Sequence, residues 1–207
     1  MYAKNAWEKY SEKELKDLMK FNDEYIKFLS KAKTERESVK LSKEILEAKG
    51  FKDGYKEEKL NPGDKVYFTN KGKNIAAFVI GDEPIEAGLR VLGAHIDSPR
   101  LDVKQNPLYE KNSFAMLDTH YYGGVKKYQW VTVPLAIYGV VCKKDGTIVD
   151  VSIGDDKDDP IVGISDLLIH LSADQMQKPA SKVIEGEDLD VTLGSIPLKG
   201  DEKEPVK

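Results

Sequence analysis

The sequence predicts an α/β fold in which two helices and a few short strands are followed by a β-rich second half. Apolar residues recur every three or four positions over residues 6–49, which is the spacing of amphipathic helices. After that the apolar runs become short and rich in β-branched and aromatic residues, as in strands. Such runs dominate beyond residue 100. We therefore predict one domain over residues 1–100 and a β-rich domain over residues 101–207.

Two helices are expected first. Residues 6–31 form an amphipathic pattern whose apolar positions are Trp7, Tyr10, Leu15, Leu18, Met19, Tyr25, Ile26 and Leu29. A second helix is predicted from Thr34 to Lys49. Thr34 and Glu37 have the spacing of a capping box, and Gly50 can take the left-handed conformation that ends a helix.

Three short strands are expected to complete the first domain. They cover residues 65–70, 74–81 and 89–95, and the segment NKGKN at residues 70–74 is the expected hairpin turn between the first two. The third run, LRVLGAH, ends at His95, one of three histidines in the chain. It therefore places a histidine where a strand is predicted to end.

The second domain is predicted to consist mainly of strands. They fall in residues 113–122, 130–144 and 147–154, with a turn at Asp145-Gly146. Residues 155–160, DDKDDP, are expected to form a solvated loop, because their acidic residues lack the spacing and glycine of an EF-hand calcium site. Residues 164–177 are compatible with a short helix capped by Ser165 or Asp166.

The composition limits the classes of partner and of location. The 32 basic and 36 acidic residues are well mixed and give a net charge of −4, which argues against nucleic acid or an anionic membrane as the main partner. No run of apolar residues is long enough to span a membrane, and the charged N-terminus does not resemble a secretory signal. The single cysteine, Cys142, excludes an internal disulfide and is expected to be a buried, inert thiol. We therefore expect a cytoplasmic protein.

His95 and Asp97 form the best candidate site. In an extended segment residues i and i+2 project to the same side, and strand ends are where open α/β sheets place their sites. An aspartate beside a metal-bound histidine can orient its ring. A His-x-Asp pair also arises by chance, so the residues alone leave ordinary loop chemistry, a catalytic pair and a metal ligand open.

Other candidate chemistries have weaker signals. A serine hydrolase with His95 as base lacks a Gly-x-Ser-x-Gly elbow, and Ser98 lies too close along the chain to be the obvious nucleophile. The sequence contains no His-Glu-x-x-His, no Cys-x-x-Cys and no P-loop. His120, in DTHYYGG, could belong to a pocket wall or to a turn with surface aromatics. His170, between Ile169 and Leu171, has the setting of a partly buried packing residue. A mononuclear site of the three histidines is neither supported nor excluded by their spacing.

Several longer segments resemble one known family. Residues 91–110, VLGAHIDSPRLDVKQNPLYE, are similar to the GAHxDSPxLxxKxxP stretch of the aspartyl aminopeptidase and aminopeptidase I family of dizinc metallopeptidases. The later YYGG, the segment around Trp130, and DLLIHL followed by DQ occur in the same order as in that family. The resemblance implies a hydrolase that removes N-terminal residues from peptides through a metal-activated water. It also implies two Zn²⁺ ions per complete site, or other divalent ions in their place.

The resemblance also assigns roles to individual residues. It makes His95 a direct metal ligand and Asp97 the catalytic residue that orients its imidazole. His170 matches a histidine that reaches into a neighbouring subunit's active site and assists catalysis there. On this basis residues 1–100 are the N-terminal half of a zinc-peptidase-like catalytic domain. Residues 101–207 belong to a β-rich inserted assembly domain, and self-association into a homo-oligomer is expected.

Two departures from the family pattern refine these expectations. Thr132-Val133-Pro134 replaces a charged triplet of the aspartyl branch, which favours the aminopeptidase I branch and puts a preference for acidic N-terminal residues in doubt. The family's remaining metal ligands come from a later part of the chain, and no matching cluster occurs here. We therefore expect this chain to be an N-terminal portion that is not competent alone. A non-catalytic assembly or binding module derived from the family is the alternative.

Overall fold

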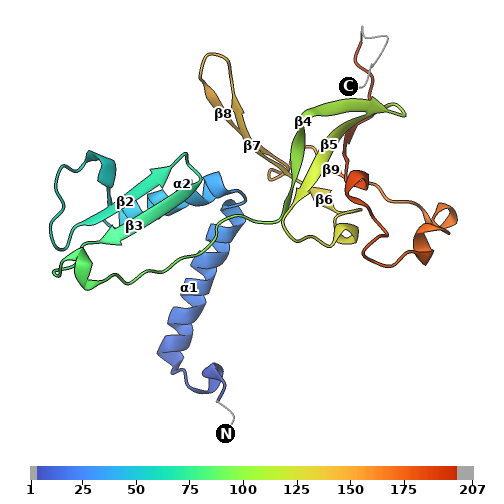
Figure 1. The fold of residues 1–207 in the computed structure, drawn as a ribbon. Coiled ribbons are helices and arrows are strands. Elements are labelled where there is room, and N and C mark those ends of the chain that lie inside the picture. Colours follow the sequence, from blue (N-terminus) through green and yellow to red (C-terminus); the bar gives the residue numbers. More distant parts are fainter. Residues whose placement is uncertain (1–3, 200–207) are drawn as a thin grey trace. The chain divides into compact units, whose positions relative to one another are not determined.

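The computed structural model of the chain describes residues 4–199 and divides into two compact units between Asp97 and Ser98 (Figure 1). The first unit carries two helices and a three-stranded sheet, and the second is built almost entirely from strands and short turns. The α/β class predicted from the sequence is therefore confirmed. The roles assigned above to the two parts of the chain stay predictions. No helix within residues 4–199 is long and apolar enough to cross a bilayer.

The N-terminal helices begin at capping boxes. The first predicted helix is divided into a short 3₁₀ turn, η1 (Ala6–Glu8), and helix α1 (Glu12–Lys31), because Ser11 exchanges hydrogen bonds with Glu14 and starts a new helix. Helix α2 (Glu35–Ala48) begins at the predicted Thr34 cap, and Gly50 follows its end with a φ of +84°. The second helix prediction is confirmed to within one residue.

A small mixed sheet lies beside α2. Strand β2 (Lys65–Asn70) pairs antiparallel with β3 (Asn74–Val79) through the predicted hairpin, and parallel with the short β1 (Lys52–Asp53). The buried Tyr67 of β2 donates a hydrogen bond from its hydroxyl to Glu47 of α2 at 2.6 Å. Burial and the Glu47 carboxylate raise the pKa of Tyr67 to about 12. This contact ties the helix to the sheet.

The third strand predicted for this unit, residues 89–95, is wrong. After the 3₁₀ turn η3 (Ile85–Ala87) the chain has no helix or strand up to Pro99. Leu89, Val91 and Leu92 are exposed, and Leu92 reaches 101% of its reference accessible area. A strand needs a neighbour for its backbone hydrogen bonds, and no segment of residues 4–199 pairs with this run. The apolar pattern is present without the partner that would make it a strand.

The second unit is organised around a five-stranded sheet. Its order is β4-β5-β10-β9-β6, where the strands are β4 (Arg100–Lys111), β5 (Phe114–Tyr122), β6 (Pro134–Leu135), β9 (Val162–Gly163) and β10 (Val191–Gly194). The β4–β5 ladder runs from Arg100 opposite Tyr122 to Lys111 opposite Phe114, with a register shift between Val103 and Leu108. Strands β7 (Ile137–Cys142) and β8 (Ile148–Ile153) form a separate two-stranded ribbon (Figure 1).

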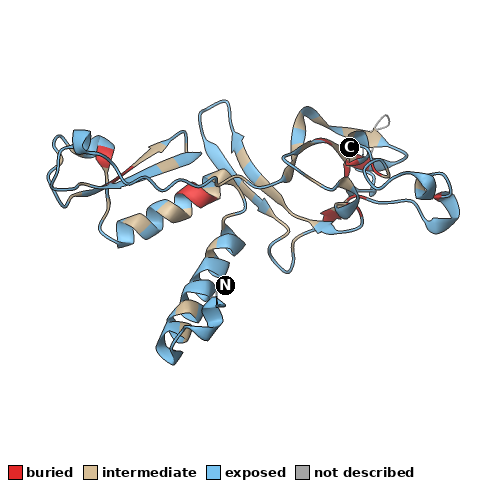
Figure 2. Cartoon of the chain, turned by 60° about the horizontal axis from the view of Figure 1, so that its bottom comes forward, coloured by how far each residue is buried: buried red, intermediate tan, exposed pale blue. Residues whose placement is uncertain are grey.

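The core of the second unit is small (Figure 2). Its buried members are contributed mostly by loops and short strands: Val131, Val162, Ile164, Ile184, Leu189 and Val191. Leu189 follows the 3₁₀ turn η7 (Gly186–Asp188) and is fully buried, and its carbonyl accepts a hydrogen bond from the buried Thr119 hydroxyl at 2.7 Å. This residue joins β5 to the rest of the core.

Two expectations for the second unit are wrong for the same reason. Residues 164–177 form only the single 3₁₀ turns η5 (Ile169–Leu171) and η6 (Gln175–Gln177), joined by irregular chain. Asp166 accepts hydrogen bonds from the Leu167 amide and the Gln175 side chain instead of capping a helix. Cys142 is exposed at the end of β7, and within residues 4–199 the β7–β8 ribbon pairs with no further strand. Both predictions assumed a buried apolar face that the described residues do not provide.

The predicted Asp145-Gly146 turn is confirmed. Gly146 has a φ of +85°, the Lys143 amide donates to the Thr147 carbonyl at 2.8 Å, and the Asp145 carboxylate accepts from the Thr147 amide. Local turn residues therefore fix this hairpin without help from packing.

The role of Leu189 can be measured by truncation. We expect Leu189→Ala to lower the free energy of unfolding by about 2–5 kcal/mol, because it removes buried methyl groups from a core with few members. Urea unfolding followed by circular dichroism measures the change. Leu198→Ala is the matched control, since Leu198 is 64% exposed. Equal effects of the two substitutions would contradict the assignment of Leu189 to the core.

Candidate metal centre

The structure brings His95 and Asp97 together. The His95 Nδ1 atom lies 3.0 Å from the Asp97 carboxylate oxygen Oδ1 and 3.1 Å from the Asp97 backbone carbonyl. The side chains are 84% and 37% exposed, respectively. A proton on Nδ1 donates to both oxygens and leaves the lone pair of the ring on Nε2. The pair therefore forms although the predicted strand does not, because a two-residue spacing suffices for the contact.

This geometry suits one ligand of a metal ion. Zinc binds a neutral imidazole nitrogen, and a carboxylate on the other ring nitrogen fixes the tautomer and the direction of the ring. An exposed pair of this kind contributes little to folding stability. The effect of the pair is instead to hold the Nε2 atom of His95 in one orientation.

The described residues do not complete a metal site around His95. A zinc site needs three or four protein ligands. Among residues 4–199 no group of three or more histidine, cysteine, aspartate or glutamate side chains is arranged to hold a metal ion. The hypothesis of a mononuclear site built from His95, His120 and His170 therefore receives no support from the structure.

His170 is placed differently from the expectation based on its neighbours. It lies in the turn η5 and is exposed, so its reading as a partly buried packing residue is wrong. The apolar residues around it are exposed as well: Leu167, Leu168, Ile169 and Leu171. A histidine in an exposed apolar segment can contact the surface of another protein chain.

His120 belongs to strand β5 and not to a turn. Its exposed ring stacks on that of Tyr121, with ring centroids 5.3 Å apart, and it lies opposite Asp102 in the ladder. The turn follows at Gly123, which has a φ of +81°.

The carboxylates of the acidic loop, residues 155–160, accept hydrogen bonds from nearby amides and hydroxyls. Asp159 accepts hydrogen bonds from the amides of Gly154 and Asp156, which lower the pKa of its carboxyl group. Asp155 accepts from the Tyr138 and Ser152 hydroxyls. These carboxylates are engaged as hydrogen-bond acceptors, as expected for a loop without a calcium site.

Sequence reasoning passed over two basic residues in the same stretch as His95. Lys104 forms ion pairs with Asp118 at 2.7 Å and Glu187 at 2.9 Å, and both partners raise the pKa of Lys104. Arg100 contacts Asp102 at 2.7 Å. The alternation of basic and acidic residues in RLDVK was the available signal, since residues i and i+2 share one face of a strand.

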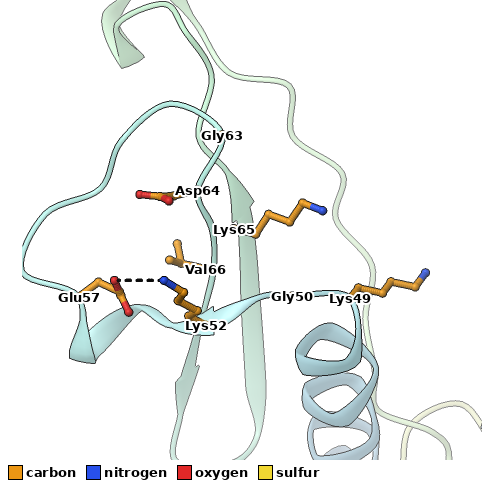
Figure 3. A pocket seen from close by; sticks show the side chains of 8 residues that line it. All are labelled: Lys49, Gly50, Lys52, Glu57, Gly63, Asp64, Lys65 and Val66. Atoms are coloured by element: carbon orange, nitrogen blue, oxygen red, sulfur yellow. Dashed lines mark ion pairs between the residues drawn. The ribbon is translucent and has the colours of Figure 1, made fainter.

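Two hollows are lined by residues other than the histidine pair. One, of about 260 Å³ in the first unit, is lined by Lys49, Gly50, Lys52, Glu57, Gly63, Asp64, Lys65 and Val66. In it Lys52 pairs with Glu57 at 4.0 Å, while Lys49 and Lys65 point away from the hollow (Figure 3). The other, in the second unit, is mainly apolar and includes Phe114, Met116 and Thr132. Neither hollow contains a histidine, so the site hypothesis remains with His95.

Known proteins match this chain along its whole length. The family model described as aminopeptidase I zinc metalloprotease (M18) matches residues 28–206. The chain belongs to the M18 aminopeptidase family. A probable M18 family aminopeptidase 1 from Clostridium acetobutylicum is 56% identical over 99% of the chain, and one from Thermotoga maritima is 46% identical over all of it. A probable M18 family aminopeptidase 2 from Clostridium novyi is 31% identical over 90% of the chain.

Solved M18 structures have the same fold. The crystal structure of the Thermotoga maritima M18 aminopeptidase superposes with a TM-score of 0.91 at 45% identity. That of aminopeptidase I from Clostridium acetobutylicum superposes with a TM-score of 0.86 at 53% identity. The chain spans 45% of the length of the two M18 aminopeptidase 1 relatives named above. The family resemblance seen in residues 91–110 is confirmed, and the higher identity to the aminopeptidase 1 relatives agrees with the branch favoured by Thr132-Val133-Pro134.

The orienting role of Asp97 can be tested on the histidine itself. We expect Asp97→Ala to remove the carboxylate acceptor of the Nδ1 proton, leaving the backbone carbonyl, and so to change the tautomer balance of the His95 ring, with little change in folding stability. Two-dimensional ¹H–¹⁵N spectra of the imidazole nitrogens measure this balance. The signals of His120 serve as the internal control and should not shift. Unaltered His95 nitrogen signals in Asp97→Ala would show that the carboxylate does not set the tautomer.

Proposed function

We propose that the protein containing this chain is a zinc aminopeptidase that removes N-terminal residues from peptides. The observation that carries this proposal is the His95–Asp97 pair, which is formed within the segment matched by a zinc metalloprotease family. The histidine presents one ring nitrogen outward while the aspartate holds the other. Family membership supports the reaction class, and the contact between His95 and Asp97 supports His95 as one ligand.

The metal site we propose holds two zinc ions, with His95 as one ligand. When bound, zinc supplies Lewis acidity that polarises a peptide carbonyl and lowers the pKa of water. Residues 4–199 contain no group of three or more histidine, cysteine, aspartate or glutamate side chains arranged to hold a metal ion, so His95 is the one ligand we assign among them. Asp97 keeps the His95 ring in the tautomer that leaves Nε2 unprotonated. It also makes the imidazole a stronger ligand.

We further propose that the protein self-associates and that His170 acts in a neighbouring copy's site. In support, His170 is exposed and stands between exposed apolar side chains, which is the composition of a surface that another chain covers. An imidazole delivered in this way can donate a hydrogen bond to a substrate carbonyl oxygen as negative charge develops on it. His170 would then complete the site of a neighbouring copy.

The assignment of His95 predicts a specific loss. We expect His95→Ala in the complete polypeptide to weaken zinc binding and to lower aminopeptidase activity by several orders of magnitude, because a metal ligand is removed. Competition with a chromogenic chelator measures the zinc affinity, and release of an N-terminal residue from a short peptide measures activity.

His120→Ala is the matched control for this experiment. It removes a histidine that is also exposed but lies in β5 and stacks on Tyr121. The control should retain both zinc binding and activity. Full zinc affinity in His95→Ala would overturn the metal assignment, and a complete polypeptide without any peptidase activity would favour the non-catalytic assembly module.

The role of His170 in another subunit predicts complementation. We expect His95→Ala and His170→Ala proteins to be inactive separately but to regain part of the activity when they are unfolded together and refolded as mixed oligomers. In mixed oligomers some sites combine an intact His95 from one chain with an intact His170 from another. Activity per site, measured against each variant refolded alone, gives the outcome. No recovery in oligomers shown by mass to be mixed would contradict action in trans.

A further inference from the structure

Helix α1 carries an apolar face that is not buried in the described structure. None of the 20 residues of the helix is buried (Figure 2). At 100° per residue its apolar side chains fall within about 120° of the helix surface. Together with Asn22 they form what we call the α1 stripe: Leu15, Leu18, Met19, Tyr25, Ile26 and Leu29. Because most of the stability of a helix this short comes from packing such a face, the α1 stripe indicates a partner.

The α1 stripe is symmetric about Asn22. Its apolar members lie at equal distances before and after this residue, and so form the pairs Leu15 with Leu29, Leu18 with Ile26, and Met19 with Tyr25. A two-fold axis at Asn22 therefore sets each apolar side chain of one helix against an apolar side chain of an antiparallel copy. A surface that complements itself in this way is what a two-fold symmetric contact requires.

Asn22 lies in the middle of the apolar stripe. It is exposed, and its side chain has no hydrogen-bond partner within residues 4–199. In the antiparallel pair the two Asn22 amides face each other, and each can donate to and accept from the other. A single polar residue in an apolar seam lowers stability but favours the one alignment in which it finds its partner. Asn22 thus selects the register that the apolar pairs also favour.

The charges of α1 favour another protein over a membrane as the partner. The helix carries five acidic and five basic residues and so has no net charge, whereas a helix that binds an anionic bilayer has an excess of basic residues. Glu12 and Glu14 lie in the first turn and Lys31 in the last. An antiparallel pair therefore brings unlike charges and opposite ends of the helix dipoles together at each end.

The comparisons favour a second copy over the fold common to the family. The family model matches residues 28–206, so the members of the α1 stripe other than Leu29 precede the matched region. The aminopeptidase 1 relative from Thermotoga maritima matches this chain over its whole length. Helix α1 is thus shared with that relative but lies largely outside the pattern of the family. A contact that only some members make fits this distribution better than a contact with the fold that all members share.

We propose that the α1 stripe is a docking surface for a second copy of this chain, in which two α1 helices pair antiparallel about a two-fold axis at Asn22. The inference rests on the proposed self-association and needs neither zinc nor His95. The face is about 30 Å long and 10 Å wide, which is smaller than the roughly 800 Å² that each partner buries in a standard interface. The contact therefore adds to other surfaces of the oligomer.

A disulfide at the two-fold axis tests the contact. Helix axes pack about 8–10 Å apart, which leaves roughly 4–5 Å between facing Cα atoms, close to the span of a disulfide. The complete polypeptide with Cys142→Ser is the background, since Cys142 is exposed. We expect Asn22→Cys to form disulfide-linked dimers at least about 10-fold faster than Glu24→Cys, because the axis holds the two thiols together. Glu24 is the matched control, since it lies on the opposite side of the helix.

Two further variants test the direction of the helices. Leu15→Cys and Leu29→Cys proteins with different affinity tags are co-expressed and then oxidised. In the antiparallel arrangement these two proteins link to each other and not to themselves. Leu15→Cys chains that link mainly to one another would overturn the antiparallel pair.

The dependence on the apolar stripe has its own matched pair of substitutions. We expect Ile26→Glu to slow the linking of Asn22→Cys by at least about 10-fold, because it buries a carboxylate without a partner. Ile45→Glu changes an isoleucine of similar exposure in α2 and should alter the rate by less than about 2-fold. Circular dichroism checks that both variants keep their helices. Equal rates in the two variants would contradict docking through the stripe.

Sedimentation of the complete polypeptide separates this inference from the proposed self-association. If the protein is oligomeric but Asn22→Cys links no faster than Glu24→Cys, only the α1 contact is overturned. If the protein is monomeric, the proposed self-association is wrong and the α1 contact falls with it. A thiol at position 22 that is shielded from a thiol reagent in a monomer would show that the rest of the same polypeptide covers the stripe.

Discussion

The antiparallel pairing of β4 with β5 is the interaction on which the second unit depends. It is the longest ladder among residues 4–199, and several parts of the unit are attached to it: β10 pairs with β5, Leu189 is held by Thr119, and Lys104 links β4 to β5 and to η7. The hydrophobic core of this unit is small, so the backbone hydrogen bonds between paired strands hold together much of the unit. A long ladder of this kind tolerates exposed apolar positions elsewhere because its hydrogen bonds do not require them to be buried.

Local signals were sufficient to predict those elements whose stability is local. The Thr34–Glu37 capping box and the Asp145-Gly146 turn are formed by hydrogen bonds within a few residues, and both were predicted correctly. The strand expected at residues 89–95 and the helix expected at 164–177 failed because an apolar pattern shows only that a face could be buried. Whether it becomes a strand or helix depends on a partner, which no local pattern contains. Cys142 was misplaced by the same assumption.

The candidate site likewise combines features that local sequence signals predict with features that they do not. The contact between His95 and Asp97 follows from their spacing. The residues alone left loop chemistry, a catalytic pair and a metal ligand open, and the resemblance of residues 91–110 to a metallopeptidase family favoured the metal ligand. The exposed position of His170 could not be inferred from its neighbours, since leucine and isoleucine on either side usually indicate burial. The contacts of Arg100 with Tyr122 and Ser98 were also overlooked. Tyr122 lies 22 residues from Arg100 in the sequence, and the Ser98 atom that Arg100 contacts is the backbone carbonyl oxygen.

Under the proposed function, the lack of regular structure in residues 88–99 bears on the affinity for the metal. A ligand carried on an unpaired segment adopts its binding geometry for only part of the time, so the measured dissociation constant exceeds the intrinsic one by the inverse of that fraction. Any contact that raises the fraction tightens binding without touching the ion. Under the same proposal, a compliant ligand also accommodates ions of different radius and preferred geometry, so His95 by itself would discriminate little between divalent metals.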